Sequence, residues 1–241
     1  HWGIGHSQFA WNLRKNKKIL DVYANFWGVE PEELLVSFDG SSFHLPPEIT
    51  KRGYNRGNTW YHSDQSYTRN EFECIQSFIT LNDINKGDAT LSVMEKSNLY
   101  HKDFADFYDI KDKKDWYKLK KEEEQFYLKH GCNISNITCP KGSLVIWDSR
   151  TIHCGIESMR NREKPNIRAI CYLCYFPRSK STNKLLEKKK KAFTNLRTTS
   201  HWPHKATLFP KLPRTYGKDI PNIREIEPPQ MDSISLKLAG F

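Results

Sequence analysis

The segment WYHSDQ contains a histidine and an aspartate, His62 and Asp64, separated by one residue. The segment alternates as a β-strand does, so both side chains point to the same face. An imidazole and a carboxylate side by side can each supply one ligand to a metal ion. His153, just after the strand-like segment GSLVIWDSR, is the best candidate for a second imidazole. Two histidines and one carboxylate form the facial triad of non-heme Fe(II) sites, which leaves coordination positions open.

Arg168 is the candidate for holding a cosubstrate beside such a metal. A 2-oxo acid can take two of the open positions and dioxygen the third. The far carboxylate of 2-oxoglutarate then needs a cation that keeps its charge and binds both oxygens, which favours arginine over lysine. Arg168 opens the strand-like segment RAICYLCYF, fifteen residues after His153. Arg160 and Arg162 are nearer to His153 in sequence, but MRNREKPN is predicted to be a loop, so Arg168 is preferred.

The segment EFECIQSFITL also alternates and is predicted to be a strand with one apolar and one partly polar face. Gln76 and Phe78 lie on the partly polar face. Gln76 is a candidate donor to the carboxylate of 2-oxoglutarate or to a substrate, and ordinary packing is the alternative for both residues. Residues beside the predicted triad are candidates for the substrate entrance, whereas Trp147 and Asp148 are expected to be structural. The entrance candidates are Asn58, Thr59, Trp60, Gln65 and Tyr67.

Four segments together resemble the phytanoyl-CoA dioxygenase superfamily of Fe(II)- and 2-oxoglutarate-dependent oxygenases. They are WYHSDQ, CIQSFITLNDINKGDATLSVMEKSN, GSLVIWDSRTIHCG and NIRAICYLCYFPR, and the resemblance runs from about residue 34 to 178. The family's HxD pair falls on His62 and Asp64, its distal histidine on His153 and its 2-oxoglutarate arginine on Arg168. Phe78 is near the position where the family often has an aromatic ring over the cosubstrate. The DATLSVMEKSN stretch departs from the family pattern and lacks its usual histidine.

This resemblance implies the fold and the reaction. The fold implied is α+β with a mainly β core, a double-stranded β-helix (jelly roll, cupin-like) with flanking helices. The cofactors implied are Fe(II), 2-oxoglutarate as cosubstrate and O2, and the reaction is hydroxylation with succinate and CO2 as co-products. Related halogenases lack the carboxylate ligand, so the presence of Asp64 favours hydroxylation.

The chain is expected to form one domain with three parts. Residues 1–33 are predicted to be helical, with an N-cap at Ser7 and a stop at Gly28. Residues 34–178 form the β-helix core, within which 103–129 is predicted to be helical. Residues 179–241 form a basic helix and a proline-rich extension. In that helix the residues expected to face inward, with the lysines outward, are Leu185, Leu186 and Phe193.

The charge of +10 is concentrated in one segment. Residues 180–218 hold eleven Lys or Arg and one acid, Glu187, while the rest of the 241 residues is neutral. A basic segment can attract nucleic acid or an acidic partner, although a solvated helix face is the simpler explanation and no nucleic-acid module is evident.

Composition excludes several classes. Hydrophobic residues make up 37% of the chain, enough to form a core, so a wholly disordered chain is excluded. The longest apolar run, Ala169–Phe176, is too short to span a membrane, which takes about 20 residues. Six cysteines are too few for a disulfide framework, and the CxxC of Cys171 and Cys174 lies in a predicted strand. A reducing, cytoplasmic location is therefore expected, with the sequons at Asn133 and Asn136 arising by coincidence.

Three functions remain open. The first is an oxygenase acting on a small organic substrate. The second is the same chemistry on a nucleic acid or protein held by residues 180–218. The third is a non-catalytic β-helix binding module, against which the intact set of His62, Asp64, His153 and Arg168 argues.

Overall fold

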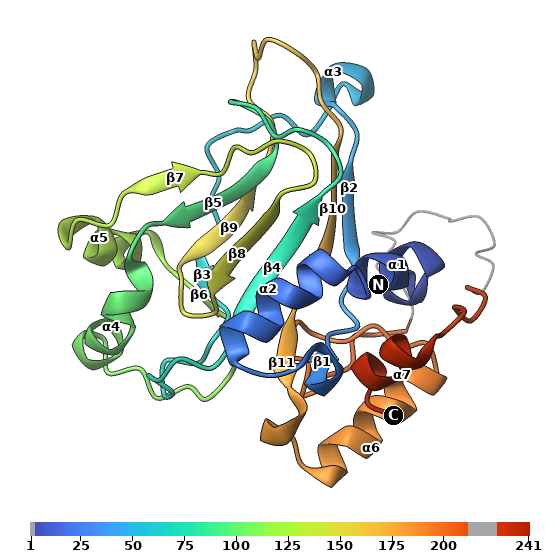
Figure 1. Cartoon of the computed structure of the whole chain (residues 1–241). Helices are drawn as coiled ribbons and strands as arrows, with labels where there is room; N and C mark the ends of the chain where they lie inside the picture. Colours follow the sequence, from blue (N-terminus) through green and yellow to red (C-terminus); the bar gives the residue numbers. More distant parts are fainter. Residues whose placement is uncertain (1–2, 212–225) are drawn as a thin grey trace. The chain divides into compact units, whose positions relative to one another are not determined.

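A computed structural model describes residues 3–211 and 226–241. It combines α-helices with mainly antiparallel β-strands (Figure 1). The α-helices are α1 (Gln8–Arg14), α2 (Lys17–Trp27), α3 (Pro47–Thr50), α4 (His101–Phe107), α5 (Lys121–Lys129), α6 (Asn183–Thr194) and α7 (Ser233–Ala239). The strands are β1 (Leu34–Val36), β2 (Ser41–His44), β3 (His62–Ser63), β4 (Ile75–Thr80), β5 (Thr90–Met94), β6 (Tyr117–Lys118), β7 (Ile134–Asn136), β8 (Leu144–Asp148), β9 (His153–Ile156), β10 (Arg168–Leu173) and β11 (Tyr175–Pro177).

The strands of the described residues form three sheets. Their orders are β1-β11, β2-β10-β4-β8 and β6-β3-β9-β5-β7. In the five-stranded sheet β3 pairs antiparallel with β9 and with β6. A mixed chain with mainly antiparallel sheets agrees with the α+β class predicted from the sequence.

Contacts along the chain group its residues into two compact units. The first unit comprises the described residues of His1–Ser42, Gln76–Ile79 and Cys171–Phe241. The second unit comprises Phe43–Ile75 and Thr80–Ile170.

The N-terminal helices of the first unit follow local capping signals. The Ser7 side chain accepts a hydrogen bond from the Ala10 amide at 3.3 Å, and Gly28 ends α2 in the left-handed region with φ 65°. Both predictions are confirmed. The prediction of one continuous helical stretch is wrong at Asn16, because this side chain caps a second helix, α2.

The basic helix α6 is present, but the prediction that all its lysines face outward is wrong. Lys189 is 1% exposed; its Nζ donates a hydrogen bond to the Val36 carbonyl and lies 3.9 Å from the centre of the Phe38 ring. Burial lowers its pKa well below the ordinary lysine value. The expected inward residues Leu185, Leu186 and Phe193 are half-buried.

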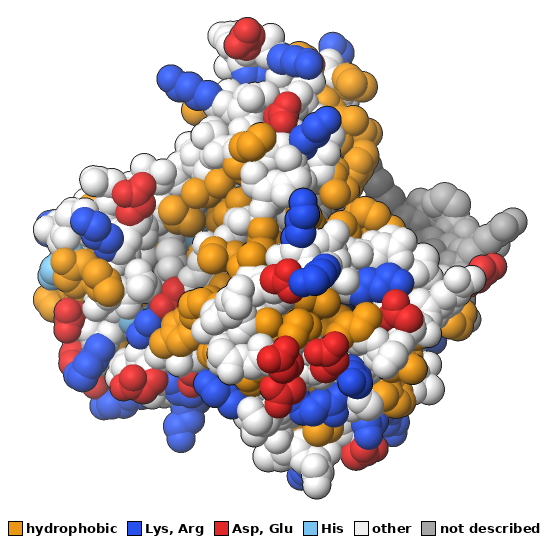
Figure 2. Space-filling view, viewed as in Figure 1, with side chains coloured by type: hydrophobic (Ala, Val, Ile, Leu, Met, Phe, Trp, Pro, Cys, Tyr) orange, Lys and Arg blue, Asp and Glu red, His pale blue; other side chains and the backbone are white. Residues whose placement is uncertain are grey.

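On the face of the molecule drawn in Figure 2, positive and negative side chains are mixed. Part of the predicted basic segment, residues 212–218, lies outside the described residues. None of the described helices has the length and apolar character needed to cross a membrane. All six cysteines fall in the described ranges, and each is a free thiol.

In the second unit an aromatic cluster joins residues of β5 and β9 with residues of α4 and α5. The prediction that 103–129 is helical holds for α4 and α5 but is wrong between them, where the chain forms the short strand β6. Pairing with β3 fixes β6, and such a long-range partner is not visible in the local charge pattern. The buried cluster is formed by Tyr61, Tyr67, Met94, Phe104, Ala105, Leu119, Phe126, Tyr127, Cys132, Ile152 and Cys154.

Candidate metal centre

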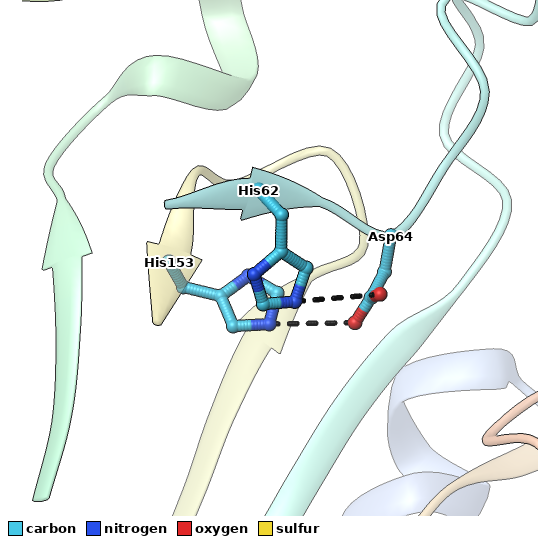
Figure 3. Close-up of side chains that lie close together, drawn as sticks. All are labelled: His62, Asp64 and His153. Carbon is cyan, nitrogen blue, oxygen red and sulfur yellow. Dashed lines mark ion pairs between the residues drawn. The ribbon is translucent and has the colours of Figure 1, made fainter. Parts of the chain in front are cut away.

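Two neighbouring strands of the second unit bring His62, Asp64 and His153 together. His62 on β3 is the cross-strand partner of His153 on β9, and the centres of their rings are 4.3 Å apart. Asp64 directly follows β3, where its amide donates to the Ser149 carbonyl at 3.2 Å. Figure 3 shows both imidazoles pointing toward the carboxylate. One ligand atom from each of the three residues lies within 4.8 Å of the others, which is close enough for one metal ion.

The hydrogen bonds of the two imidazoles fix which nitrogen is available. The Nδ1 of His62 lies 3.2 Å from the Trp60 carbonyl, and the Nδ1 of His153 lies 2.8 Å from the Thr151 carbonyl. A carbonyl oxygen only accepts, so each Nδ1 carries a proton and Nε2 is the nitrogen through which each ring can bind a metal. Metal-binding histidines are commonly oriented in this way.

Both Nε2 atoms face the same carboxylate. The Nε2 of His62 is 3.5 Å from Oδ1 of Asp64, and the Nε2 of His153 is 3.3 Å from Oδ2. Two imidazole nitrogens and one carboxylate converge at these distances, so a single cation among them could bind all three. The donor set, two nitrogens and a carboxylate, suits Fe(II). These residues therefore fit a divalent metal.

Aromatic side chains surround the two imidazoles. The Trp60 ring stacks on His62 at 4.8 Å and an angle of 5°, and the Trp116 ring lies 5.8 Å from His62. On the other imidazole, the Trp147 ring lies 5.4 Å from His153. The histidines are nearly buried, whereas the Asp64 side chain keeps 14% of its surface exposed. Of the three side chains, that of Asp64 is the most exposed.

The turn after Asp64 is held by Gln65, which contradicts its predicted place at the substrate entrance. Gln65 is fully buried; its amide nitrogen donates to the carbonyls of Arg69 and Glu71, and its amide oxygen accepts from the Ser149 hydroxyl. Tyr67, with the same predicted place, is also buried.

Tyr67 belongs to the aromatic cluster instead. Its hydroxyl bonds to that of Tyr127 at 2.8 Å. The structural role expected for Asp148 is observed, because its carboxylate accepts from the Arg150 amide and guanidinium.

Arg168 begins β10 and is 8% exposed. Burial lowers the pKa of His44, and the positive charge of Arg168 lowers it further, whereas the negative charge of Glu157 raises it. The two alternatives considered for its role are engaged elsewhere. Arg162 makes two hydrogen bonds to Glu48 and one to Asp88, and the guanidinium of Arg160 lies 4.3 Å from the centre of the Tyr54 ring.

Gln76 and Phe78 lie on β4, within the stretch of that strand that belongs to the first unit. Both are buried, and strand alternation places them on one face. Their contact with a cosubstrate stays a prediction.

Sequence reasoning missed Trp116 as a neighbour of the candidate centre. The stretch KDKKDWYK was assigned to a helix, so its tryptophan was not associated with His62. The available signal was a lone tryptophan among charged residues, which is an unfavourable place for a ring that has no partner or ligand.

The chain is similar to a curated protein and to several solved structures. No family model matches the chain. It is 27% identical over 214 residues to Ava biosynthesis cluster protein O from Aspergillus versicolor, covering 85% of this chain and 66% of that relative. The chain thus spans just under two thirds of the curated relative.

Solved structures with a similar arrangement include EctD from S. alaskensis, with 18% identity, a TM-score of 0.46 and coverage of 73% of this chain and 55% of that one. EctD has been solved with bound Fe and with 2-oxoglutarate and 5-hydroxyectoine. Another is SnoN, a non-heme alpha ketoglutarate dependent epimerase from nogalamycin biosynthesis, with 11% identity, a TM-score of 0.41 and coverage of 69% and 55%. At these identities the likeness concerns the fold alone.

Proposed function

We propose that the chain is an Fe(II)- and 2-oxoglutarate-dependent oxygenase that hydroxylates a small organic substrate. The observation that supports this most is the convergence of two Nε2 atoms and one carboxylate in the His62, Asp64 and His153 group. In this proposal the β-rich part of the chain is a double-stranded β-helix within a single oxygenase domain.

The three residues would hold iron on one face. Iron with 2-oxoglutarate and O2 supplies the oxidising power, and succinate and CO2 are the co-products. The carbonyls of Trp60 and Thr151 orient both imidazoles through Nδ1, so that Nε2 is the nitrogen that would bind the metal. Asp64 would supply the carboxylate ligand that related halogenases lack, which favours hydroxylation over halogenation.

Arg168 would bind the far carboxylate of 2-oxoglutarate. It is nearly buried, where an arginine binds a carboxylate most strongly, and Arg162 already has two carboxylate partners. Gln76 and Phe78 are the further residues for which the sequence predicts cosubstrate contacts, as a hydrogen-bond donor and an apolar wall.

A small-molecule substrate is favoured over a macromolecule. The fungal relative is named for a biosynthesis cluster, the setting of small-molecule chemistry. The basic helix α6 presents fewer positive charges to a partner than its composition suggests, because Lys189 is buried. A nucleic-acid substrate therefore has no support beyond net charge.

The proposal is tested by succinate formation from 2-oxoglutarate. The purified chain is loaded anaerobically with Fe(II) and then exposed to O2, with and without a pool of small metabolites. We expect slow succinate release that Asp64→Ala and His153→Ala abolish while circular dichroism stays unchanged. Asp109→Ala, which removes an exposed carboxylate paired with Lys111, is the matched control and should retain turnover. Full activity in Asp64→Ala would refute the assignment.

A further inference from the structure

Two exposed tryptophans flank one proposed metal ligand. Trp60 is 42% exposed and Trp116 is 51% exposed, and no other tryptophan of the described ranges is among the exposed large hydrophobic residues. Both rings lie within 6 Å of the His62 ring, measured between centres. Exposing indole surface to water is unfavourable, and an exposed apolar patch beside a reactive centre is typical of a ligand site.

The Trp60 ring is held rigidly. Its Nε1 donates to the Gly155 carbonyl at 2.9 Å, and its face is nearly parallel to the His62 imidazole. The ring edge also packs over Gly155, where an added Cβ would lie 3.5 Å from Cζ2. A ring fixed in this way loses little further entropy when it binds a ligand.

Trp116 adopts a strained backbone. Its φ is +83°, a region that bulky residues rarely adopt, so the surrounding structure must impose it. The next residue, Tyr117, begins β6 and pairs with Ser63 of β3. Strain of this kind concentrates at functional sites.

The loop that carries Trp116 is tied to the turn that follows Asp64. The Asp115 carboxylate accepts a hydrogen bond from the Ser66 amide at 3.2 Å and pairs with the Arg69 guanidinium. The Ser66 hydroxyl in turn donates to the Asp112 carbonyl at 3.0 Å. The loop before Trp116 is thus held against the turn at Ser66 and Arg69.

We propose that Trp60 and Trp116 bind the substrate by stacking on a planar aromatic ring beside the metal. This inference rests on the proposed function for the presence of the metal. Two rigid, exposed indoles favour a flat ring with complementary π-faces. The substrate class is therefore a molecule that contains a planar aromatic ring.

The test uses 2-naphthol and its saturated analogue, trans-decahydro-2-naphthol, as probes. Their Kd values are measured by saturation-transfer NMR on the metal-free protein and, anaerobically, on the protein with Fe(II) and 2-oxoglutarate. We expect 2-naphthol to bind about tenfold more tightly than the saturated analogue, as a stacking contribution predicts. Trp60→Ala and Trp116→Ala should each weaken 2-naphthol binding roughly fivefold or more, whereas Trp60→Phe and Trp116→Phe should restore most of the affinity.

The control removes an exposed ring of the same unit. Phe107 is 70% exposed on α4 and packs against Tyr108 and Phe126, so Phe107→Ala should leave the Kd unchanged. Equal affinity for the two probes, no binding of 2-naphthol by the wild-type chain, or unaltered binding in both alanine variants would overturn the proposal. The metal-free titration gives its result whether or not the chain turns over 2-oxoglutarate, so a failure here is distinct from a failure of the proposed function.

Discussion

At the scale of single residues, two arginines of the second unit illustrate different uses of a buried charge. Arg162 forms ion pairs with Glu48 and Asp88, with N–O distances of 2.7 and 2.5 Å, and these partners raise its pKa. Arg168 begins β10, and its positive charge adds to burial in lowering the pKa of His44. The first is expected to maintain the fold, and the second is expected to bind the cosubstrate.

Replacing Arg168 should affect cosubstrate binding selectively. We expect Arg168→Ala to weaken 2-oxoglutarate binding by about 2–5 kcal/mol, the cost of breaking a buried charge pair on one side. Anaerobic calorimetry with the Fe(II)-loaded protein measures this directly. Arg160→Ala, which removes an exposed guanidinium of the same unit, should leave the affinity unchanged. Wild-type affinity in Arg168→Ala would refute the role.

Replacing Arg162 should instead destabilise the fold. Arg162→Ala leaves the Asp88 carboxylate, 5% exposed, without its main cation. The free energy of unfolding should fall by about 3–5 kcal/mol, as for other broken buried pairs. Urea denaturation checks this, and the double variant Arg162→Ala/Asp88→Ala should lose less than the sum of the single losses. Additive losses would show that the pair is not coupled.

At the scale of elements, the loop before β6 positions the Trp116 ring. Contacts of Asp115 with Ser66 and Arg69 hold this loop in place. Asp115→Ala removes the bonds to Ser66 and Arg69, so Trp116 should leave its strained conformation. We expect this variant to weaken 2-naphthol binding in the wild-type background but to have no further effect in Trp116→Ala. A double-mutant cycle measures this coupling. An equal effect in both backgrounds would mean that Asp115 acts only on stability.

The same elements show what sequence could and could not predict. Alternation around His62 and the strand-like segments before and after His153 were sufficient to locate the three candidate ligands, because side-chain direction in a strand is local. The short strand β6 was missed because its pairing with β3 is a long-range contact. The burial of Lys189 was missed for a related reason: the Val36 carbonyl and the Phe38 ring that surround its amine come from a distant segment.

At the scale of the whole molecule, buried histidines should make stability depend on pH. Burial lowers the pKa of His6 to about 3 and that of His101 to about 4, with a smaller contribution from nearby arginines. As the pH falls through about 6.5, the unfolded chain takes up protons at both positions and the folded chain does not. The free energy of unfolding should therefore decrease, by roughly 2 kcal/mol for each histidine between pH 7 and pH 5.

Urea denaturation at the two pH values measures this loss. His101→Gln, which cannot titrate, should reduce it by the share of one histidine, while exposed His130 serves as the control in His130→Gln. An unchanged pH dependence in His101→Gln would contradict the assignment.

The central claim is that His62, Asp64 and His153 bind one Fe(II) ion, and anaerobic titration of the metal-free protein with Fe(II) tests it most directly. We expect the wild-type chain to bind one equivalent. Asp64→Ala and His153→Ala should lose most of the affinity, and His44→Ala, which removes an imidazole outside the group, should keep it. Wild-type affinity for Fe(II) in both Asp64→Ala and His153→Ala would contradict the account.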